Sequence, residues 1–308
     1  MAKKTYVVMG ATGQIGRVVC EELLNQGHTV KAIGRDPRKL EYLKNMGAEA
    51  VQVESFDRKE FIIQAFEGAD GAFCLIPPGH NVEKFGVYQN NVGEAVKEAI
   101  AKNSIGYVVN LSSIGAHLPD GTGPIKGLHQ QEERLNTLTN VNVLHLRPAY
   151  FMENFFWSIP VILQTGMLKT PLKPDLSLPL VATPDIGMKA AEFLNQLDFQ
   201  GHTIFELAGP RDITLTEATK ILGTAIGKPD LKYAQFPYEE TKKGMLASGM
   251  RGEMVDLLIE MYHAFNEGKC QFTQKLTPDH RGKIAFEQFA RAFGEVYKVE
   301  NRPRVTIS

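Results

Sequence analysis

Three glycines at three-residue spacing, Gly10, Gly13 and Gly16, are the residues whose type and spacing point most directly to chemistry. An apolar run ends at Met9 just before them, and an apolar-periodic segment follows them as far as Gly27. This order predicts a buried strand, a tight glycine turn, and a helix whose N-terminus faces the turn. Unpaired N–H groups and the positive end of the helix dipole would meet there and suit the pyrophosphate of a dinucleotide. A tight turn without a ligand is the alternative. We predict that the whole turn contacts a cofactor: Gly10, Ala11, Thr12, Gly13, Gln14, Ile15 and Gly16.

The residues about 20 positions beyond the glycines should distinguish NAD from NADP. Arg35 stands where an acid would select NAD, and its guanidinium suits the 2′-phosphate of NADP. Lys39 adds a second positive charge one helical turn further on. Asp36 is the competing residue, because its carboxylate can hold a ribose 2′-hydroxyl, yet it also precedes Pro37 as a helix N-cap would. We predict NADP(H), with Arg35 and Lys39 as its cationic contacts.

Two further strand ends are predicted to reach the cofactor. Phe56 and Asp57 follow the third predicted strand, where an adenine edge is usually met, although Asp57 suits a helix cap equally well. Ile76 and Pro77 end the fourth strand, and the proline keeps the backbone open beside the expected ribose.

The end of the fifth predicted strand carries the candidate reacting groups. Ser112 and Ser113 end that strand, so one hydroxyl should face the crevice, unless the pair only caps the loop. A short-chain dehydrogenase would next show Tyr-x-x-x-Lys, yet no tyrosine lies between Gly115 and Asn142, and we interpret the match at 238–242 as chance. His129 and Glu133 are four residues apart on one helix face, either as a proton donor beside the crevice or as a surface pair. The catalytic candidates are therefore His129 and Ser113.

Composition bounds the remaining classes of function. A formal charge of −1, with Lys and Arg dispersed along 308 residues, predicts no nucleic-acid partner, and no run reaches the roughly 18 apolar residues of a membrane span. The opening residues enter a predicted strand at once and leave no room for a signal peptide. Three separated cysteines predict buried free thiols and a reducing, cytoplasmic compartment, and no histidine has metal-ligand spacing. We expect a small-molecule substrate and no metal, and the sequence leaves a homodimer open.

The elements that must position these residues alternate regularly over the first half of the chain. Short apolar runs rich in β-branched residues predict strands, and amphipathic segments between them predict helices. The fold class is α/β, a doubly wound parallel sheet of the Rossmann type. The predicted strands are 5–9, 29–33, 50–53, 71–76, 107–111 and 142–146, and the predicted helices are 14–26, 37–46, 58–66, 82–102 and 128–138.

After Pro148 the texture of the sequence changes. A proline-rich stretch that includes Pro171 and Pro179 is expected to interrupt regular structure, and helical patterns follow it. We predict an NAD(P)-binding domain over residues 1–150 and a smaller, mostly helical C-terminal cap over 151–308. A strand at 203–207 and a helix should return to the main sheet, and 232–236 should pair elsewhere.

These residues together resemble the NmrA-like family of atypical short-chain dehydrogenase/reductases. The resemblance rests on five segments in the family's order: Gly10 to Gly16, Gly34 to Pro37, Leu111 to Ser113, Glu133, and Leu146 to Asn154. It implies that the glycine turn, Arg35 and Lys39 hold NADP, and that Ile76, Pro77, Pro148, Tyr150 and Phe151 flank the nicotinamide. Where members often carry a lysine, this chain has His129 to Glu132, which is similar to the quinone-reductase branch.

The resemblance also frames the expected function. Members are NADPH-dependent reductases of quinones, dyes and plant phenolics, or NADP-binding regulators without evident chemistry. We therefore expect an NADP(H)-binding oxidoreductase that passes a hydride to a small planar acceptor such as a quinone or azo compound. The alternative is a non-catalytic NADP(H)-sensing regulator. A nucleotide-sugar epimerase or dehydratase is a weaker third hypothesis, because it needs the absent Tyr-x-x-x-Lys pair.

Overall fold

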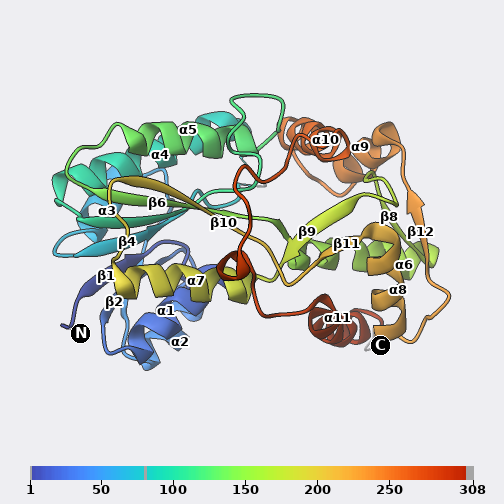
Figure 1. The fold of residues 1–308 in the computed structure, drawn as a ribbon, viewed down its shortest axis with the longest axis horizontal. Helices are drawn as coiled ribbons and strands as arrows, with labels where there is room; N and C mark the ends of the chain where they lie inside the picture. The colour runs from blue at the N-terminus through green and yellow to red at the C-terminus, as the bar shows by residue number, and fades with distance from the viewer. Residues whose placement is uncertain (1, 80–81, 303–308) are drawn as a thin grey trace, which may run out of the picture.

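The computed structural model describes residues 2–79 and 82–302, and its centre is a seven-stranded sheet (Figure 1). Every neighbouring pair in this sheet is parallel, in the order β10-β6-β5-β4-β1-β2-β3. The strands are apolar and buried because helices cover both faces. They are β1 (Thr5–Val8), β2 (Thr29–Gly34), β3 (Glu49–Gln52), β4 (Gly71–Cys74), β5 (Tyr107–Leu111), β6 (Asn142–Pro148) and β10 (His202–Leu207).

Two hydrophobic clusters join the sheet to its helices, one on each face. Helices α1 (Gln14–Asn25), α2 (Pro37–Asn45) and α7 (Thr183–Gln196) pack on one face, and α3 (Lys59–Ala65), α4 (Phe85–Lys102) and α5 (Ile125–Asn136) pack on the other (Figure 1). The predicted doubly wound α/β fold is confirmed. The predicted buried free thiols are confirmed as well, since Cys20, Cys74 and Cys270 are buried and unpaired.

The chain returns to the main sheet in its second half. Strand β10 lies parallel to β6, with Phe205 opposite Leu146. Helix α7 packs directly on α1, and Gly187 permits the close approach, because a Cβ there would lie 2.6 Å from Val18. Residues 184–197 therefore pack on the face of the sheet that also carries α1, and they are not part of the cap.

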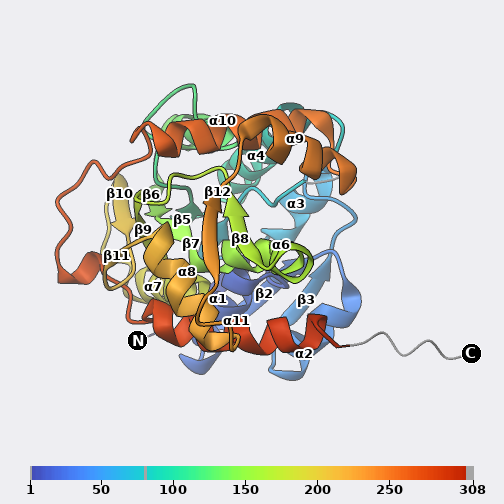
Figure 2. The same cartoon turned by 90° about the vertical axis from the view of Figure 1, so that its right-hand side faces the viewer.

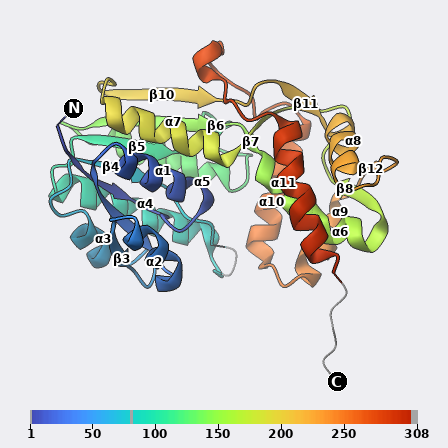
Figure 3. The ribbon, with the colours of Figure 1, turned by 90° about the horizontal axis from the view of Figure 1, so that it is seen from below.

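The rest of the second half forms a body beside the carboxyl ends of the strands (Figures 2 and 3). It contains two small sheets, β11-β9-β7 and β12-β8, among helices. Its elements are β7 (Tyr150–Phe151), η1 (Met152–Ser158), α6 (Ile159–Thr165), β8 (Met167–Thr170), β9 (Ser177–Val181), β11 (Asp212–Thr214), α8 (Leu215–Ala225), β12 (Lys232–Gln235), α9 (Tyr238–Ala247), α10 (Gly252–Asn266), η2 (Pro278–His280) and α11 (Phe286–Glu300).

One expectation about this body was wrong. The proline-rich stretch does not simply interrupt regular structure, because β9 runs through Pro179. Strand β7 pairs only with Leu180 and Val181, so β9 has a single neighbouring strand, β11, at Pro179. A proline is tolerated where one side of the strand is open.

A segment between α10 and α11, residues 271–284, covers the edge of β10. Gln274 donates from Nε2 to the Ile204 carbonyl at 3.0 Å, and the Ala208 N–H donates to the His280 carbonyl at 2.9 Å. The buried carboxylate of Glu206 accepts from the main-chain N–H of Thr273 at 2.9 Å. The segment thereby pairs with an edge that would otherwise be exposed.

Within residues 2–79 and 82–302, no helix has both the length and the apolar character needed to cross a bilayer.

Candidate functional site

The glycine turn between β1 and α1 has the geometry of a backbone cradle. Gly10 has φ +63°, and its carbonyl accepts the N–H of Gly13 at 2.9 Å. A Cβ on Gly16 would lie 2.3 Å from the Gly10 carbonyl oxygen, so only glycine lets α1 start this close to the turn. No side chain caps the helix and its first turn holds no acid. The N-terminus of α1 therefore keeps donors and positive potential for an anion, which fits a dinucleotide pyrophosphate.

The turn lies where the order of the sheet reverses. Strands β1 and β4 are neighbours, while β2 and β5 extend the sheet in opposite directions from them. Ligands of open α/β sheets bind at such a switch point, beside the carboxyl ends of the strands. The loop after β4 reaches the turn, since a Cβ on Gly10 would lie 3.0 Å from the side chain of Leu75. Ile76 is half-buried and Pro77 is buried in the same loop.

A cleft of about 320 Å³ opens beside the turn. Two cations line it: Lys39 from α2, which the sequence predicted, and Arg17 from α1, which it did not. Arg17 follows Gly16 directly and lies 3.7 Å from Glu21, and the signal that could have found it is a basic residue on the first turn of α1. The cleft is lined by Ala11, Thr12, Gly13, Gln14, Arg17, Lys39, Tyr42 and Leu43.

The end of β2 separates the roles of Arg35 and Asp36. Asp36 caps α2 by accepting the N–H of Arg38 at 2.9 Å, with Pro37 next in the helix, so the predicted N-cap is confirmed. That N–H, followed by the charge of Arg38, lowers the pKa of Asp36. Arg35 is exposed, and its charge opposes the burial that raises the pKa of Tyr88 to about 12. The carboxylate is thus engaged by the backbone while the guanidinium faces solvent.

The loop after β3 places its two candidates differently. The side chain of Phe56 is 2% exposed and belongs to the hydrophobic cluster with α3 and α4. Only the main chain of Phe56 is therefore available to contact a ligand. Asp57 accepts a hydrogen bond from the Ser55 hydroxyl. It does not cap the next helix, since the N-cap of α3 is Arg58.

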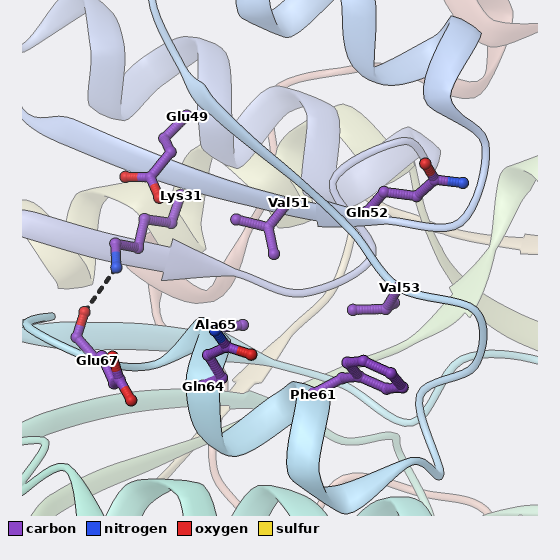
Figure 4. Close-up of a pocket in the computed structure, with 9 residues that line it drawn as sticks. All are labelled: Lys31, Glu49, Val51, Gln52, Val53, Phe61, Gln64, Ala65 and Glu67. Atoms are coloured by element: carbon purple, nitrogen blue, oxygen red, sulfur yellow. Dashed lines mark hydrogen bonds between the residues drawn. The ribbon is translucent and has the colours of Figure 1, made fainter.

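A second hollow, also about 320 Å³, shares no residue with the cleft beside the turn. It lies along the edge strand β3 (Figure 4). Val51 of the strand, Val53 just after it and Ala65 of α3 line the hollow. The exposed Phe61 of α3 lies on its rim. Lys31 is fixed there by donating to the Glu67 carbonyl at 2.6 Å. None of the predicted site residues lines this hollow.

The carboxyl ends of β5 and β6 hold a buried ion pair. Arg147 donates to Glu132 at 2.9 Å from Nε and 2.5 Å from Nη2, and both side chains are at most 5% exposed. The Ser112 hydroxyl donates to the same carboxylate at 2.5 Å. Glu133, which is one of the segments that carry the family resemblance, is exposed, and its neighbour Glu132 is the acid that faces the sheet.

The two catalytic candidates are each held by a main-chain carbonyl of the loop after β5. Ser113 is half-buried, and its hydroxyl donates to the Ile114 carbonyl at 2.9 Å. His129 Nδ1 lies 2.9 Å from the Ala116 carbonyl, so Nδ1 carries the hydrogen and Nε2 remains for another partner. Among the described ion pairs and hydrogen bonds, none joins His129 to Glu133, so the surface-pair alternative is not what the structure shows.

The chain leaves the main sheet between Pro148 and Phe151. Pro148 is buried and its carbonyl accepts the Ile114 N–H at 2.9 Å. The ring of Tyr150 packs edge-on against Phe265 at 5.5 Å, and burial holds the pKa of its phenol well above the usual value. Tyr150 and Phe151 form β7, which pairs with β9. They therefore sit where the sheet and the second body meet.

A contact that the sequence did not suggest ties the second body to the glycine turn. Glu153 accepts the main-chain N–H of Thr183 at 3.0 Å and its hydroxyl at 2.7 Å. The Thr183 hydroxyl also lies 3.5 Å from Oε1 of Gln14, the first residue of α1. Burial raises the pKa of Glu153.

The distant Tyr-x-x-x-Lys match has structural partners of its own. The ring of Tyr238 stacks on His263 at 3.7 Å, and Lys242 pairs with Asp256 at 2.5 Å. Both residues lie in the α9–α10 hairpin, which agrees with the interpretation of the match as chance. Across the described residues, no cluster of His, Cys, Asp and Glu could hold a metal ion.

Comparison with known proteins identifies the family of the domain that contains the cradle. Residues 10–154 match the family described as NAD(P)H-binding, a span that runs from the glycine turn to the end of the Leu146–Asn154 segment. The chain carries an NAD(P)H-binding domain. Its fold is shared with solved structures that include an NADPH-dependent quinone oxidoreductase and NmrA, which agrees with the family resemblance of the sequence.

Individual relatives extend this comparison. The chain is 25% identical to the 40 kDa subunit of mitochondrial NADH-ubiquinone oxidoreductase from Neurospora crassa, over 73% of this chain and 60% of that protein, so it spans less than two thirds of the relative's length. An NADPH-dependent quinone oxidoreductase from Escherichia coli superimposes with a TM-score of 0.75 at 19% identity, over 95% of this chain and 99% of that one. NmrA, a negative transcriptional regulator solved with NAD, superimposes with a TM-score of 0.71 at 17% identity, over 98% and 99%.

Proposed function

We propose that this NAD(P)H-binding protein is an NADPH-dependent reductase that passes a hydride to a small planar acceptor, such as a quinone or azo compound. Residues 1–150 would bind the cofactor, and the body formed by residues 151–308 would cover the acceptor. The fold likeness to a quinone oxidoreductase supports this choice, as does the absence of Tyr-x-x-x-Lys between Gly115 and Asn142, because a quinone demands little acid catalysis from the protein.

The observation that carries the proposal is the charge around the glycine turn. Arg35 is exposed at the end of β2, Lys39 and Arg17 line the adjoining cleft, and Asp36 is occupied as a helix cap. A ribose 2′-hydroxyl would share the Asp36 carboxylate with the helix cap, whereas a 2′-phosphate would meet cations. Phe56 and Asp57 are assigned to the adenine end, and Ile76, Pro77, Pro148, Tyr150 and Phe151 to the nicotinamide end.

When bound, NADPH supplies the hydride, and the acceptor takes one proton for each hydride it receives. We assign that proton to His129. Its Nδ1–H donation to Ala116 fixes the ring and leaves Nε2 as the atom that binds and releases a proton. Ser113 donates to the Ile114 carbonyl, so its oxygen is left to accept a hydrogen bond from a reduced acceptor. The phenol of Tyr150 stays protonated and acts as a wall of the site.

The test is to follow NADPH absorbance with a panel of quinones and azo dyes, alongside a direct measurement of NADPH binding. We expect turnover with NADPH, lowered about tenfold in His129→Gln, because a quinone needs only part of the roughly 100-fold that general acid catalysis contributes. His202→Gln, an exposed histidine on β10, is the matched control and should keep full activity. Micromolar NADPH binding without turnover of any acceptor would refute the reductase and leave the NADP(H)-sensing alternative.

A further inference from the structure

The pair formed by Glu132 and Arg147 joins three elements at the carboxyl edge of the sheet. Glu132 lies on α5 and Arg147 in β6, and Ser112 follows β5 directly. The carboxylate accepts two bonds from the guanidinium, at 2.9 Å and 2.5 Å, and one from the Ser112 hydroxyl at 2.5 Å. The contacts hold α5 against the ends of two neighbouring strands at the place assigned above to the acceptor.

Stability alone is a weak reason for such a pair. Removing two charges from water costs several kcal/mol for each ion, and apolar residues of similar volume are often as stable or more so. A polar network of fixed geometry does something that an apolar core does not, because it fixes the relative placement of the groups it joins. Helix α5 carries a second ion pair, Arg134 with Glu94 of α4 at 2.7 Å, in which the arginine is 9% exposed and the carboxylate 54% exposed.

The groups fixed by the pair include both catalytic candidates. His129 precedes Glu132 by three residues, so the two share one side of α5. Main-chain bonds from Ser112 to Leu146 at 2.7 Å and from Ile114 to Pro148 at 2.9 Å fasten the Ser113 loop along the end of β6. His129 donates to Ala116 in the same loop. The helix, the loop and the strand end therefore form one unit around the carboxylate.

The pKa of a second histidine, His117, depends on the charges of this unit. His117 follows Ala116, and among the described atoms its buried Nδ1 has no hydrogen-bond partner. Burial lowers its pKa first, and the charge of Arg147 lowers it further, while Glu206 and Glu132 raise it and His129 lowers it slightly. Arg147 thus acts on His117 more strongly than Glu132 does.

We propose that Glu132 and Arg147 are positioning residues of the reductase, which together hold His129 and Ser113 in place and balance the charge beside the two histidines. This inference rests on the proposed function for its effect on turnover. Its structural part, the orientation and charge of the histidines, stands apart from any acceptor.

The decisive variant is the charge-neutral double substitution Glu132→Gln/Arg147→Met, compared with the control Glu94→Gln/Arg134→Met, whose carboxylate is exposed and which joins α5 to α4 instead of to the strand ends. We expect kcat to fall about 30-fold in the first, because small misplacements of reacting groups are costly, with the Kd for NADPH within about threefold of wild type. The control should keep kcat. In NMR titrations of the imidazole nitrogens, the pKa of His117 should rise in the double variant, since the larger influence of Arg147 is lost, and should fall in Glu132→Gln alone.

A double variant with wild-type kcat and an unchanged His117 titration would overturn the proposal. Should the wild type reduce no acceptor, the proposed function fails while the titrations still decide the positioning role. Should the double variant not fold, Ser112→Ala carries the test, because it removes one bond to the carboxylate and no charge. We expect a several-fold loss of kcat and a shifted His129 signal, and wild-type values for both would overturn the inference.

Discussion

Replacing Gly16 with alanine tests the cradle at the point where the structure leaves least room. A Cβ there would lie 2.3 Å from the Gly10 carbonyl oxygen, and ordinary contact begins at 3.4 Å, so α1 and the turn must separate by about 1.1 Å. The obstacle is backbone rather than a flexible side chain. We expect overpacking to cost about 1–3 kcal/mol of the free energy of unfolding.

The same displacement should be felt in cofactor affinity. Shifting the first N–H groups of α1 by about 1 Å would lose one or two charge-assisted hydrogen bonds, about 3 kcal/mol, which is about 100-fold in the Kd for NADPH. Gly244→Ala is the matched control, because Gly244 also lies inside a helix but a Cβ there meets nothing within 4 Å. That variant should gain up to about 1 kcal/mol from helix propensity and leave NADPH binding unchanged.

Chemical denaturation and isothermal titration with NADPH measure the two effects. The reasoning would be refuted if Gly16→Ala matched the wild type in both, or if Gly244→Ala lost as much affinity as Gly16→Ala.

Three further predictions concern the cofactor phosphate, pH and the segment over β10. Arg35→Ala should raise the Kd for NADPH about 30-fold and change that for NADH little, while the exposed neighbour variant Arg38→Ala alters neither; equal losses for both nucleotides would count against the phosphate contact. Burial lowers the pKa of His145 to about 4, below its value of 6.5 in the unfolded chain. The neutral ring therefore contributes its full stability above pH 6.5, and about 2–3 kcal/mol of the free energy of unfolding is lost as the pH falls toward 4. Denaturation at several pH values should show this slope, and His145→Gln should flatten it. Glu206→Ala should cost about 2–4 kcal/mol, because it leaves the N–H groups of Thr273 and Gln274 unpaired, yet should keep NADPH affinity; unaltered stability would show that the segment is held by other contacts.

Local signals made the first half of the fold predictable. Apolar strand runs, the Gly10–Gly16 turn and the Asp36–Pro37 cap are each written within a few consecutive residues, and these elements formed as expected. Strands β7 and β11 are two and three residues long and are defined by partners far along the chain, so no local pattern marks them. Tertiary pairing, rather than propensity, creates such strands.

The candidate site shows the same division. The cradle follows from glycine spacing, but the choice between Glu132 and Glu133 depends on which side of α5 meets β6, and Arg147 decides it from 15 residues away. The position of Arg17 in the cleft depends on how α1 and α2 pack together, which no local pattern in the sequence specifies. Residues whose role depends on the relative rotation of two elements are the ones that the sequence left undecided.

The most direct test of the reductase proposal is a single-turnover experiment. The wild-type protein, loaded with one equivalent of NADPH, is mixed rapidly with a quinone that it reduces in the panel, and the nicotinamide absorbance is followed against NADPH and quinone alone. We predict that the bound nicotinamide is oxidised at least about 1000-fold faster than the free one, with one hydroquinone formed per NADPH. Oxidation at the rate of free NADPH, for every quinone tried, would contradict the account.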